Sequence, residues 1–397
     1  MGKVEVITGN YAISYAAKLA RVQVVAAYPI TPQTQIVERI AEWVEKGELE
    51  AKFIRVESEH SAMAAIIGAS ATGARAFTAT SSHGLMYMSE VVWWAAASRL
   101  PIVMGVVNRA LGPGWNIWSE HTDVLAHRDS GWIIAFAEDN QEALDTTIQA
   151  FRIAEDERVL LPVMVSLDAF ILSHTAMPVD IPDQETIDNF LPPRKPLPFL
   201  LDPNDPVTHG SLVFPEHYME FRYLIHEAQE RAKKVILEVE DEYYKATGRR
   251  YGGLVDLYRS EDSDVIIVAL GSSAGDAKEA VDKLRDEGYK VGVARIRFVR
   301  PWPHEVLREV LGRAKGVAVV DRNMSMGKSG VLYSEVLSTL YGLKKPPVVI
   351  GYIAGLGGRD IRVSDFELIA LDVYKAIETR DLTPRYKWIN LKLEVER

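Results

Sequence analysis

Cysteine is absent from all 397 residues of the sequence. Without a thiol, the chain cannot form a disulfide, hold zinc through thiolates, use a cysteine nucleophile or ligate an iron–sulfur cluster in the usual way. Asparagine and glutamine are also scarce, with 8 and 7 copies. Depletion of these thermolabile residues together with cysteine is typical of thermophilic proteins, so the composition predicts a thermophilic source.

Excess positive charge and long apolar runs are missing as well. The 55 acidic residues outnumber the 45 Lys and Arg, for a formal net charge of −10. Because this charge repels phosphates and anionic lipid headgroups, neither nucleic acid nor a membrane is expected as a main partner. The longest apolar runs, such as residues 63–74, fall short of the roughly 18 residues of a membrane span, and residues 1–6 carry no signal-peptide or myristoylation pattern. We expect a soluble, cytoplasmic protein of two or three domains.

Short β-rich runs alternate with helical patterns over the first 170 residues. These runs end at Thr8, Ala27, Val56, Thr80, Val107, Ala137 and Leu167. Such alternation predicts a parallel sheet with helices on both faces, which is a doubly wound α/β fold. Sheets of this kind place their ligands beyond the carboxyl ends of the strands. The loops after Ala27, Val56, Thr80 and Val107 are therefore the candidates for a site.

Proline separates this region from the rest of the chain. Nine of the nineteen prolines lie within residues 178–215, and because proline fixes φ and removes a backbone donor, this stretch is predicted as an extended connector. Apolar residues then recur every three or four positions from Pro215 to Thr247, from Tyr218 and Phe221 onward, which predicts one long helix packed on the first domain. The β–α alternation returns after about residue 260 as a second, smaller α/β domain. The predicted units are residues 1–177, 178–255 and 256–397.

A rigid segment, Tyr28-Pro29-Ile30-Thr31-Pro32, follows the strand that ends at Ala27. The ordinary interpretation is a helix start with Thr31 as the N-cap and Pro32 as the first helical residue. This interpretation is compatible with function, because an N-cap hydroxyl at a strand end also faces the crevice where ligands bind.

Two carboxylates follow the next strand, in the segment Glu57-Ser58-Glu59-His60-Ser61. The apolar helix that comes after it should raise the pKa values of Glu57 and Glu59 if their side chains are buried, and such a carboxyl group suits acid or base catalysis. A carboxylate that caps the helix N-terminus is the alternative, and the segment alone favours neither.

Polar groups also follow the next two strands. His83 lies in the loop of residues 80–84, where a histidine satisfied by the protein itself is the better single interpretation. Arg109 follows the strand of residues 101–107 and suits bidentate capture of a carboxylate, with an ordinary surface arginine as the alternative. Residues 271–276 match neither common phosphate-loop pattern, so we expect an ordinary strand–helix turn there. The nine histidines show no paired metal spacing.

Four of these segments occur in order, at residues 28–32, 57–63, 108–111 and 355–360. Together they resemble the α chain of 2-oxoacid:ferredoxin oxidoreductases, most closely the pyruvate-specific members. The resemblance extends over nearly the whole chain. It implies a thiamine-diphosphate enzyme with a doubly wound, pyrimidine-binding-type first domain and a smaller α/β domain like the C-terminal domain of transketolase.

The resemblance also implies roles for individual residues. Glu59 would hydrogen-bond N1′ of the aminopyrimidine of thiamine diphosphate and so promote loss of the C2 proton. Thr31 would hydrogen-bond the 2-oxoacid, and Arg109 would pair with its carboxylate. The residues expected to line the cofactor site beside Glu59 are Tyr28, Pro29, Ile30 and His83.

One departure from the pattern of thiamine enzymes has a large consequence. The Gly-Asp-Gly sequence that usually anchors the diphosphate and Mg²⁺ does not occur, and the nearest string is Gly275-Asp276-Ala277. We therefore expect no metal ligand in this chain. The gap, like the lack of cysteine, matches the multi-subunit form of the family. There a β chain completes the thiamine diphosphate–Mg²⁺ site, and other chains of γ and δ type bring the iron–sulfur clusters. The implied reaction is the oxidative decarboxylation of pyruvate with coenzyme A and ferredoxin.

Three other interpretations stay open at this point. A sister enzyme acting on branched-chain 2-oxoacids such as 2-oxoisovalerate would share the same motifs. A self-sufficient thiamine enzyme, either a decarboxylase or a transketolase, would need the missing Gly-Asp-Gly. A non-catalytic assembly subunit would not need a carboxylate at a strand end, so the position of Glu59 argues against it.

Overall fold

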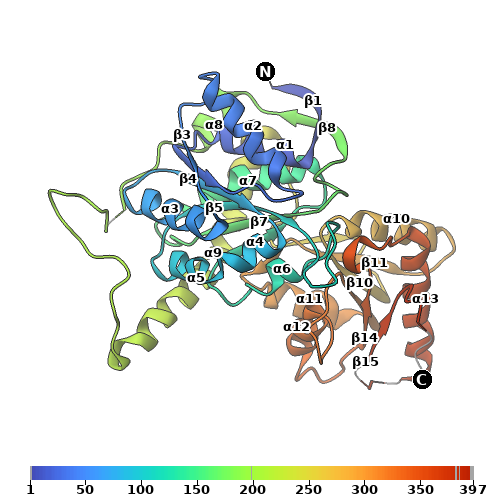
Figure 1. Cartoon of the computed structure of the whole chain (residues 1–397). Coiled ribbons are helices and arrows are strands. Elements are labelled where there is room, and N and C mark those ends of the chain that lie inside the picture. The colour runs from blue at the N-terminus through green and yellow to red at the C-terminus, as the bar shows by residue number, and fades with distance from the viewer. Residues whose placement is uncertain (1, 198, 381, 384, 394–397) are drawn as a thin grey trace.

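The computed structural model describes residues 2–197, 199–380, 382–383 and 385–393, whose strands form two large sheets (Figure 1). The larger sheet has the order β12-β6-β7-β5-β4-β2-β3, and all its neighbours are parallel except β12 and β6. Its strands are β2 (Val24–Ala27), β3 (Lys52–Arg55), β4 (Ala76–Thr80), β5 (Ile102–Asn108), β6 (Ile133–Phe136), β7 (Val163–Asp168) and β12 (Phe298–Arg300). Strands β4 to β7 are buried along their whole length, which explains why they appear in the sequence as continuous apolar runs.

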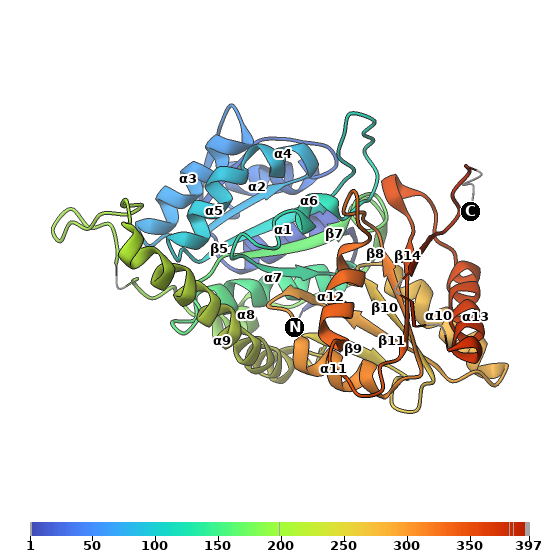
Figure 2. The ribbon, with the colours of Figure 1, turned by 90° about the horizontal axis from the view of Figure 1, so that it is seen from below.

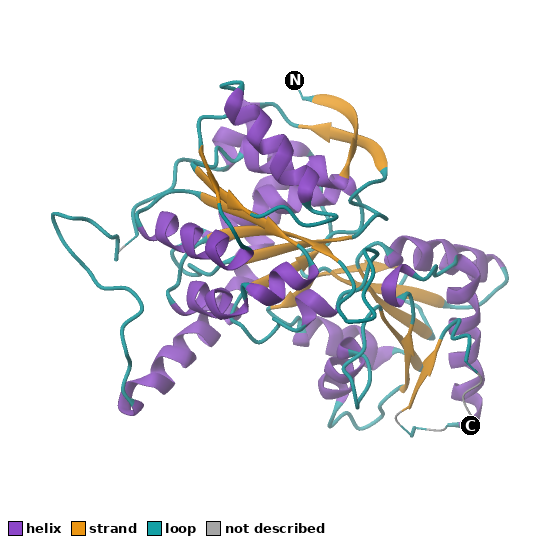
Figure 3. Ribbon diagram, in the orientation of Figure 1, coloured by secondary structure: helices purple, strands orange, loops and turns teal. Residues whose placement is uncertain are grey.

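Helices cover both faces of this sheet, as the alternation predicted (Figure 3). One face carries α1 (Gly9–Leu19), α2 (Thr34–Glu45) and α7 (Asn140–Ala154), and the other carries α3 (Glu59–Ala71), α4 (Ser82–Tyr87) and α5 (Ser89–Ala97). The chain leaves β2 toward the first face and β4 toward the second, although the two strands are neighbours. Doubly wound sheets bind their ligands where neighbouring connections diverge in this way.

The predicted extended connector contains two regular elements, so this prediction is wrong for residues 178–190. Strand β8 (Ala176–Ile181) pairs antiparallel with β1 (Lys3–Thr8) in a separate two-stranded sheet. Pro178 is tolerated there because a strand at a sheet edge has backbone donors that need no partner. Helix α8 (Gln184–Phe190) follows, capped by the Asp183 carboxylate, which accepts a hydrogen bond from the Thr186 amide (2.9 Å).

The long helix α9 (Pro215–Thr247) has the predicted bounds, with Pro215 in its first turn and Gly248 in the left-handed region at its end (φ 76°). Its apolar stripe packs on the first domain only from Ile225 onward. Before that point Tyr218 and Phe221 are 56% and 52% exposed, so the expectation that they pack on the domain is wrong. Figures 1 and 2 show the start of α9, and the loop of residues 199–214 before it, standing out from the body of the molecule.

The smaller sheet belongs to a second α/β unit, as predicted. Its order is β15-β14-β13-β10-β11-β9, and all neighbours are parallel except β9 and β11. Helices α10 (Ser273–Asp286) and α13 (Val363–Thr379) cover one face, while α11 (His304–Arg313) and α12 (Val331–Leu340) cover the other (Figure 1). The strands are β9 (Val255–Tyr258), β10 (Val265–Leu270), β11 (Val291–Ile296), β13 (Gly316–Asp321), β14 (Val348–Ile353) and β15 (Arg385–Trp388).

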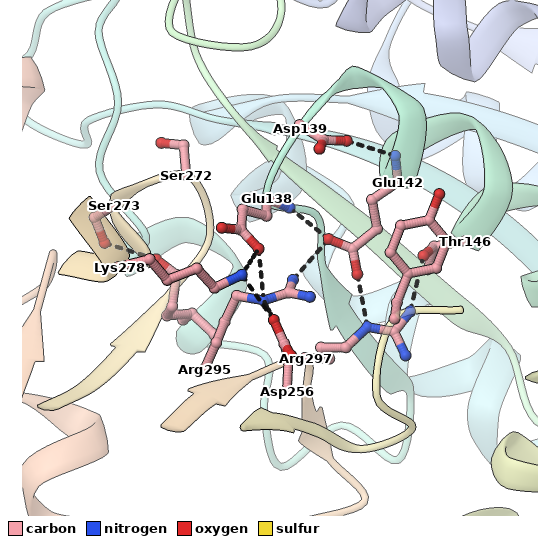
Figure 4. Close-up of polar contacts among 12 residues, drawn as sticks. Glu138, Asp139, Glu142, Thr146, Asp256, Ser272, Ser273, Lys278, Arg295 and Arg297 are labelled. Carbon is pink, nitrogen blue, oxygen red and sulfur yellow. Dashed lines mark hydrogen bonds and ion pairs between the residues drawn. The ribbon is translucent and has the colours of Figure 1, made fainter. Parts of the chain in front are cut away.

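The two α/β units are joined by buried ion pairs and by a shared strand. Glu142 of α7 accepts hydrogen bonds from Arg295 and Arg297 at the end of β11, each at 2.6 Å (Figure 4). All three side chains are buried. Immediately afterwards the chain adds β12 to the edge of the larger sheet, antiparallel to β6. Part of the predicted unit 256–397 therefore lies in the sheet of the first unit. The described residues contain no candidate for a membrane-spanning helix.

Candidate active site

Three of the predicted site residues meet in direct contact beyond the ends of β2, β4 and β5. The Arg109 guanidinium donates from Nη1 to the carbonyl oxygen of Thr31 (2.6 Å), and its Nη2 lies 3.2 Å from His83 Nδ1. Thr31 offers its backbone to this contact, and its side chain is exposed. The carboxyl-end rule for parallel sheets explains why residues so far apart in the sequence converge here.

Glu59 lies at the first position of α3, beside this cluster. Its side chain is 8% exposed and packs against Gly84 in α4, where an added Cβ would lie 2.7 Å from Glu59 Oε1 and 2.6 Å from Thr80 Oγ1. Only glycine leaves room for the carboxylate at this position. Ser58 is the N-cap of α3 and accepts a hydrogen bond from the Ser61 amide (3.2 Å), so Glu59 lies in the first turn, at the positive end of the helix dipole.

Glu57 differs from Glu59 in both exposure and electrostatics. It is exposed, and the hydrogen bond from the Ser61 hydroxyl lowers the pKa of the Glu57 carboxyl. The raised pKa was expected only for a buried side chain, and Glu57 does not meet that condition because it is exposed to solvent. Of the two carboxylates, only Glu59 is enclosed.

The loop after β2 does not begin a helix at Thr31, so the N-cap interpretation is wrong. Helix α2 begins at Thr34 with Gln33 at the N-cap position. Tertiary hydrogen bonds hold the preceding residues in a turn, since the Pro32 carbonyl accepts from Asn10 Nδ2 (2.8 Å) and the Thr31 carbonyl accepts from Arg109. In the rest of the loop Tyr28 and Pro29 are exposed and Ile30 is half-buried, and their cofactor contacts stay a prediction.

Arg109 is not an ordinary surface arginine, since only 6% of it is exposed. Burial lowers the pKa of its guanidinium, and the nearby charges of Asp123 and Glu59 oppose that shift. The indole of Trp115 covers it, with the guanidinium carbon 5.0 Å from the ring centroid. A buried guanidinium with N–H groups to spare can bind the carboxylate of a ligand with little competition from water.

Asp123 organises the site, although no motif in the sequence singles it out. It lies in α6 (Thr122–Leu125), fully buried, and accepts hydrogen bonds from the amides of Ser82 (2.9 Å) and Arg109 (3.1 Å) and from Asn108 Nδ2 (3.0 Å). Burial raises the pKa of Asp123 to about 6, although these hydrogen bonds oppose the shift. One carboxylate thus ties the loop after β4 to the loop after β5.

Several buried polar atoms around Glu59 and Arg109 lack a hydrogen-bond partner within the described part of the chain. They are Thr80 Oγ1, Ser81 Oγ, Arg109 Nε and Gln33 Oε1. Buried polar atoms of this kind are costly unless something satisfies them, so they are typical of a site that receives a polar ligand. Among all the residues that the structure describes, there is no group of three or more His, Asp or Glu side chains that could hold a metal ion.

The sequence matches two family descriptions in succession. Residues 15–241 match "Pyruvate flavodoxin/ferredoxin oxidoreductase, thiamine diP-bdg", and residues 263–366 match "Pyruvate:ferredoxin oxidoreductase core domain II". The chain belongs to the 2-oxoacid:ferredoxin oxidoreductase family. The family resemblance seen in the four strand-end motifs is therefore confirmed.

Curated members of this family match the chain from end to end. Ketoisovalerate oxidoreductase subunit VorA of Pyrococcus horikoshii is 51% identical over 98% of both chains. Pyruvate synthase subunit PorA of Methanocaldococcus jannaschii is 52% identical over 99% of both. Both relatives are named as subunits, and their identities to this chain are nearly equal although their named substrates differ. The 2-oxoacid is therefore not decided by similarity.

Solved structures share the fold. The chain matches a 2-oxoglutarate:ferredoxin oxidoreductase from Magnetococcus marinus with a TM-score of 0.71 and 22% identity, covering 94% of this chain and 65% of that chain. A split gene transketolase matches with a TM-score of 0.53 and 17% identity, covering 96% and 99%. The predicted fold class, a doubly wound thiamine-diphosphate-type domain with a smaller transketolase-like α/β domain, is confirmed.

Proposed function

We propose that this chain is the α-type subunit of a coenzyme A-acylating 2-oxoacid:ferredoxin oxidoreductase whose substrate is pyruvate. The observation that carries the proposal is the convergence of Glu59, Thr31 and Arg109 at the ends of neighbouring parallel strands. The decarboxylation of a 2-oxoacid on thiamine diphosphate needs a carboxylate at the aminopyrimidine and a cationic group for the substrate carboxylate, and an enclosed carboxylate and a desolvated guanidinium are such groups.

Arg109 is proposed to bind the carboxylate of the 2-oxoacid. Two of its five N–H groups are engaged by Thr31 and His83, so others remain for the substrate. The Thr31 side chain, exposed at the same loop, is proposed to hydrogen-bond the substrate oxygen. Charge-assisted bonds in such a dry environment fix the orientation of a small substrate.

Glu59 is proposed to hydrogen-bond the aminopyrimidine and to hold or release a proton at its N1′. The fit is supported by the enclosed carboxylate, by the glycine that makes room for it and by the buried polar atoms around it. Tyr28, Pro29, Ile30 and His83 are proposed to line the same cofactor. Thiamine diphosphate, when bound, supplies a nucleophilic carbon and an electron sink for the decarboxylation.

The rest of the enzyme is proposed to come from other chains. Iron–sulfur clusters must be ligated elsewhere because this chain has no cysteine. The described residues offer no cluster of metal ligands, which supports a β-type chain as the holder of Mg²⁺ and the diphosphate, with γ- and δ-type chains carrying the clusters. Coenzyme A and ferredoxin would act on the complete complex, and its cytoplasmic location stays a prediction.

Co-expression tests this proposal. The complex with β-, γ- and δ-type chains should be brown, contain iron and reduce ferredoxin in the presence of pyruvate and coenzyme A. The chain alone should be colourless and give no heat of binding with thiamine diphosphate and Mg²⁺ in calorimetry, because one charged hydrogen bond does not offset the loss of translational and rotational freedom. A stoichiometric, Mg²⁺-dependent heat with the isolated chain would mean that it contains the whole cofactor site.

A branched-chain 2-oxoacid is the second candidate substrate. The observation in its favour is the 51% identity to subunit VorA, a ketoisovalerate oxidoreductase subunit. The ratio of kcat/KM for pyruvate to that for 2-oxoisovalerate in the purified complex decides between the two.

A further inference from the structure

The loop between β5 and α6, residues 109–121, carries Trp115 over the Arg109 guanidinium and is held in place by the second α/β unit. Asn116 Nδ2 donates to the carbonyl of Gly357 (2.9 Å), and the Gly358 amide donates to the carbonyl of Ser119 (2.8 Å). Gly357 and Gly358 have φ values of 60° and 76°. A Cβ added to Gly357 would lie 2.6 Å from Asn116 Nδ2, and a Cβ added to Gly358 would lie 2.2 Å from Trp118 Cβ. The glycine-rich segment that stood out in the sequence is thus needed for close approach to this loop.

The loop presents an indole that is fixed but not buried. Trp115 is 54% exposed, although it stacks on the Arg109 guanidinium and meets the His83 ring edge-on at 6.2 Å between centroids. Its backbone is confined by a tight turn, because a Cβ on Gly112 would lie 2.4 Å from the Trp115 amide nitrogen. The loop therefore holds a large apolar surface beside the group that is proposed to bind the substrate carboxylate.

We infer that Trp115 determines which 2-oxoacid the site accepts, by forming the wall against which the alkyl group on C2 of the substrate lies. The inference rests on the proposed role of Arg109. A carboxylate pairs with a guanidinium in the plane of its N–H groups, and the indole covers one face of that plane. The carbon chain of a short 2-oxoacid must then pass close to the indole. A methyl group needs less of this space than an isopropyl group, so the bulky indole favours pyruvate.

The test compares two tryptophans of the same loop in the co-expressed complex. Trp115→Ala should raise the ratio of kcat/KM for 2-oxoisovalerate to that for pyruvate by about tenfold or more, since each methylene discriminated in an apolar pocket is worth roughly 10–200-fold. Trp115→Phe, which keeps an aromatic wall, should change the ratio less. Trp118→Ala is the matched control. Trp118 is 49% exposed but packs on Phe170 (6.1 Å between centroids), so this variant should leave the ratio within twofold.

The possible results separate this inference from the proposed function. A wild-type complex that turns over neither 2-oxoacid defeats the proposed function. If the wild-type complex is active and the assembled Trp115→Ala complex has a substrate ratio within twofold of wild type, the inference alone is overturned. An equal change in the ratio for Trp115→Ala and Trp118→Ala also overturns it, because the effect would then come from the loop as a whole.

Discussion

Asp168, the last residue of β7, caps a helix of the other α/β unit through Ser272. Its Oδ2 accepts hydrogen bonds from the Ser272 amide (2.9 Å) and hydroxyl (2.6 Å), directly before α10 begins at Ser273. On the other side Oδ1 lies 2.7 Å from His121 Nε2. Burial alone would raise the pKa of Asp168, but His121 and Arg322 hold it well below its usual range. A single buried carboxylate thus joins the two sheets next to the site.

Replacing Asp168 should therefore loosen the contact between the two units. Asp168→Asn removes the charge and places an amide against donors, and removing one partner of a buried pair costs about 3–5 kcal/mol. The free energy of unfolding in guanidinium chloride measures this loss. Asp360→Asn, at an exposed acidic residue of the second α/β unit, is the control and should change this free energy by less than about 0.5 kcal/mol. A loss of that small size for Asp168→Asn would contradict the prediction.

The ion pairs of Glu142 should make the same contact sensitive to acid. Burial alone would raise the pKa of this carboxyl, but Arg295 and Arg297 lower it from 4.5 to about 2. Because the folded pKa lies below the unfolded one, the stabilisation is complete above about pH 4.5 and is lost as the pH falls toward 2. It amounts to about 3 kcal/mol.

Urea unfolding at pH 6, 4.5 and 3 measures this dependence. Glu142→Gln should be less stable than wild type at pH 6, and the difference should shrink between pH 4.5 and 3. Glu216→Gln, at an exposed position of α9, should follow the wild-type curve. A difference that stays constant with pH would show that the Glu142 charge does not matter.

Glu59→Gln should nearly abolish turnover while the complex still assembles. An amide cannot exchange the proton that the carboxyl is proposed to hold, and the loss of such acid–base help costs about 10²–10⁴-fold. Steady-state ferredoxin reduction by the purified complex measures this effect. Glu57→Ala is the control, since Glu57 is exposed two residues away, and it should be far milder. Turnover of Glu59→Gln within threefold of wild type would remove Glu59 from the chemistry.

Gly84→Ala should damage the same site without touching the carboxylate itself. The added methyl group would lie 2.7 Å from Glu59 Oε1, so the side chain must move. We expect turnover to fall by at least about tenfold, since a misplacement of about 1 Å can cost 10²-fold. Gly68→Ala in α3 is the control, because a Cβ there has nothing within 4 Å, and it should leave turnover unchanged. Equal turnover for the two variants would contradict the close packing.

Arg109→Ala should raise the KM for the 2-oxoacid far more than it changes the KM for coenzyme A. A charge-assisted hydrogen bond is worth about 1.5–3 kcal/mol, which corresponds to about one to two decades. Initial rates of the complex at varied concentrations of each substrate measure both values. An unchanged KM for the 2-oxoacid would leave Arg109 with a structural role only.

Local pattern predicted the elements and part of the site. Period and composition were enough for the strands up to β7 and for α9, because β4 to β7 are continuous buried apolar runs and α9 carries an apolar stripe that is buried from Ile225 onward. Glu59, His83 and Arg109 could be selected because parallel strands bring their carboxyl ends together. Where a residue's role depended only on its position after a strand, the sequence was informative.

Tertiary contacts explain what the sequence could not predict. Thr31 carries the pattern of an N-cap, but its carbonyl is taken by Arg109, from a distant part of the chain. Asp123 and Asp168 have no motif, since their partners come from several loops or from the other sheet. The density of prolines around Pro178 suggested an extended connector. It could not show that β1, from the start of the chain, lies opposite and pairs with this segment.

Strand β12 also has a consequence for synthesis on the ribosome. It follows β6 by about 160 residues. At a synthesis rate of roughly 5–20 residues per second, β12 is therefore made roughly 8–30 s after β6. Until then the edge of β6 has unpaired backbone groups that another nascent chain could pair with. Residues 1–255 are therefore not a self-contained folding unit, and the larger sheet is closed only after most of the chain has left the ribosome.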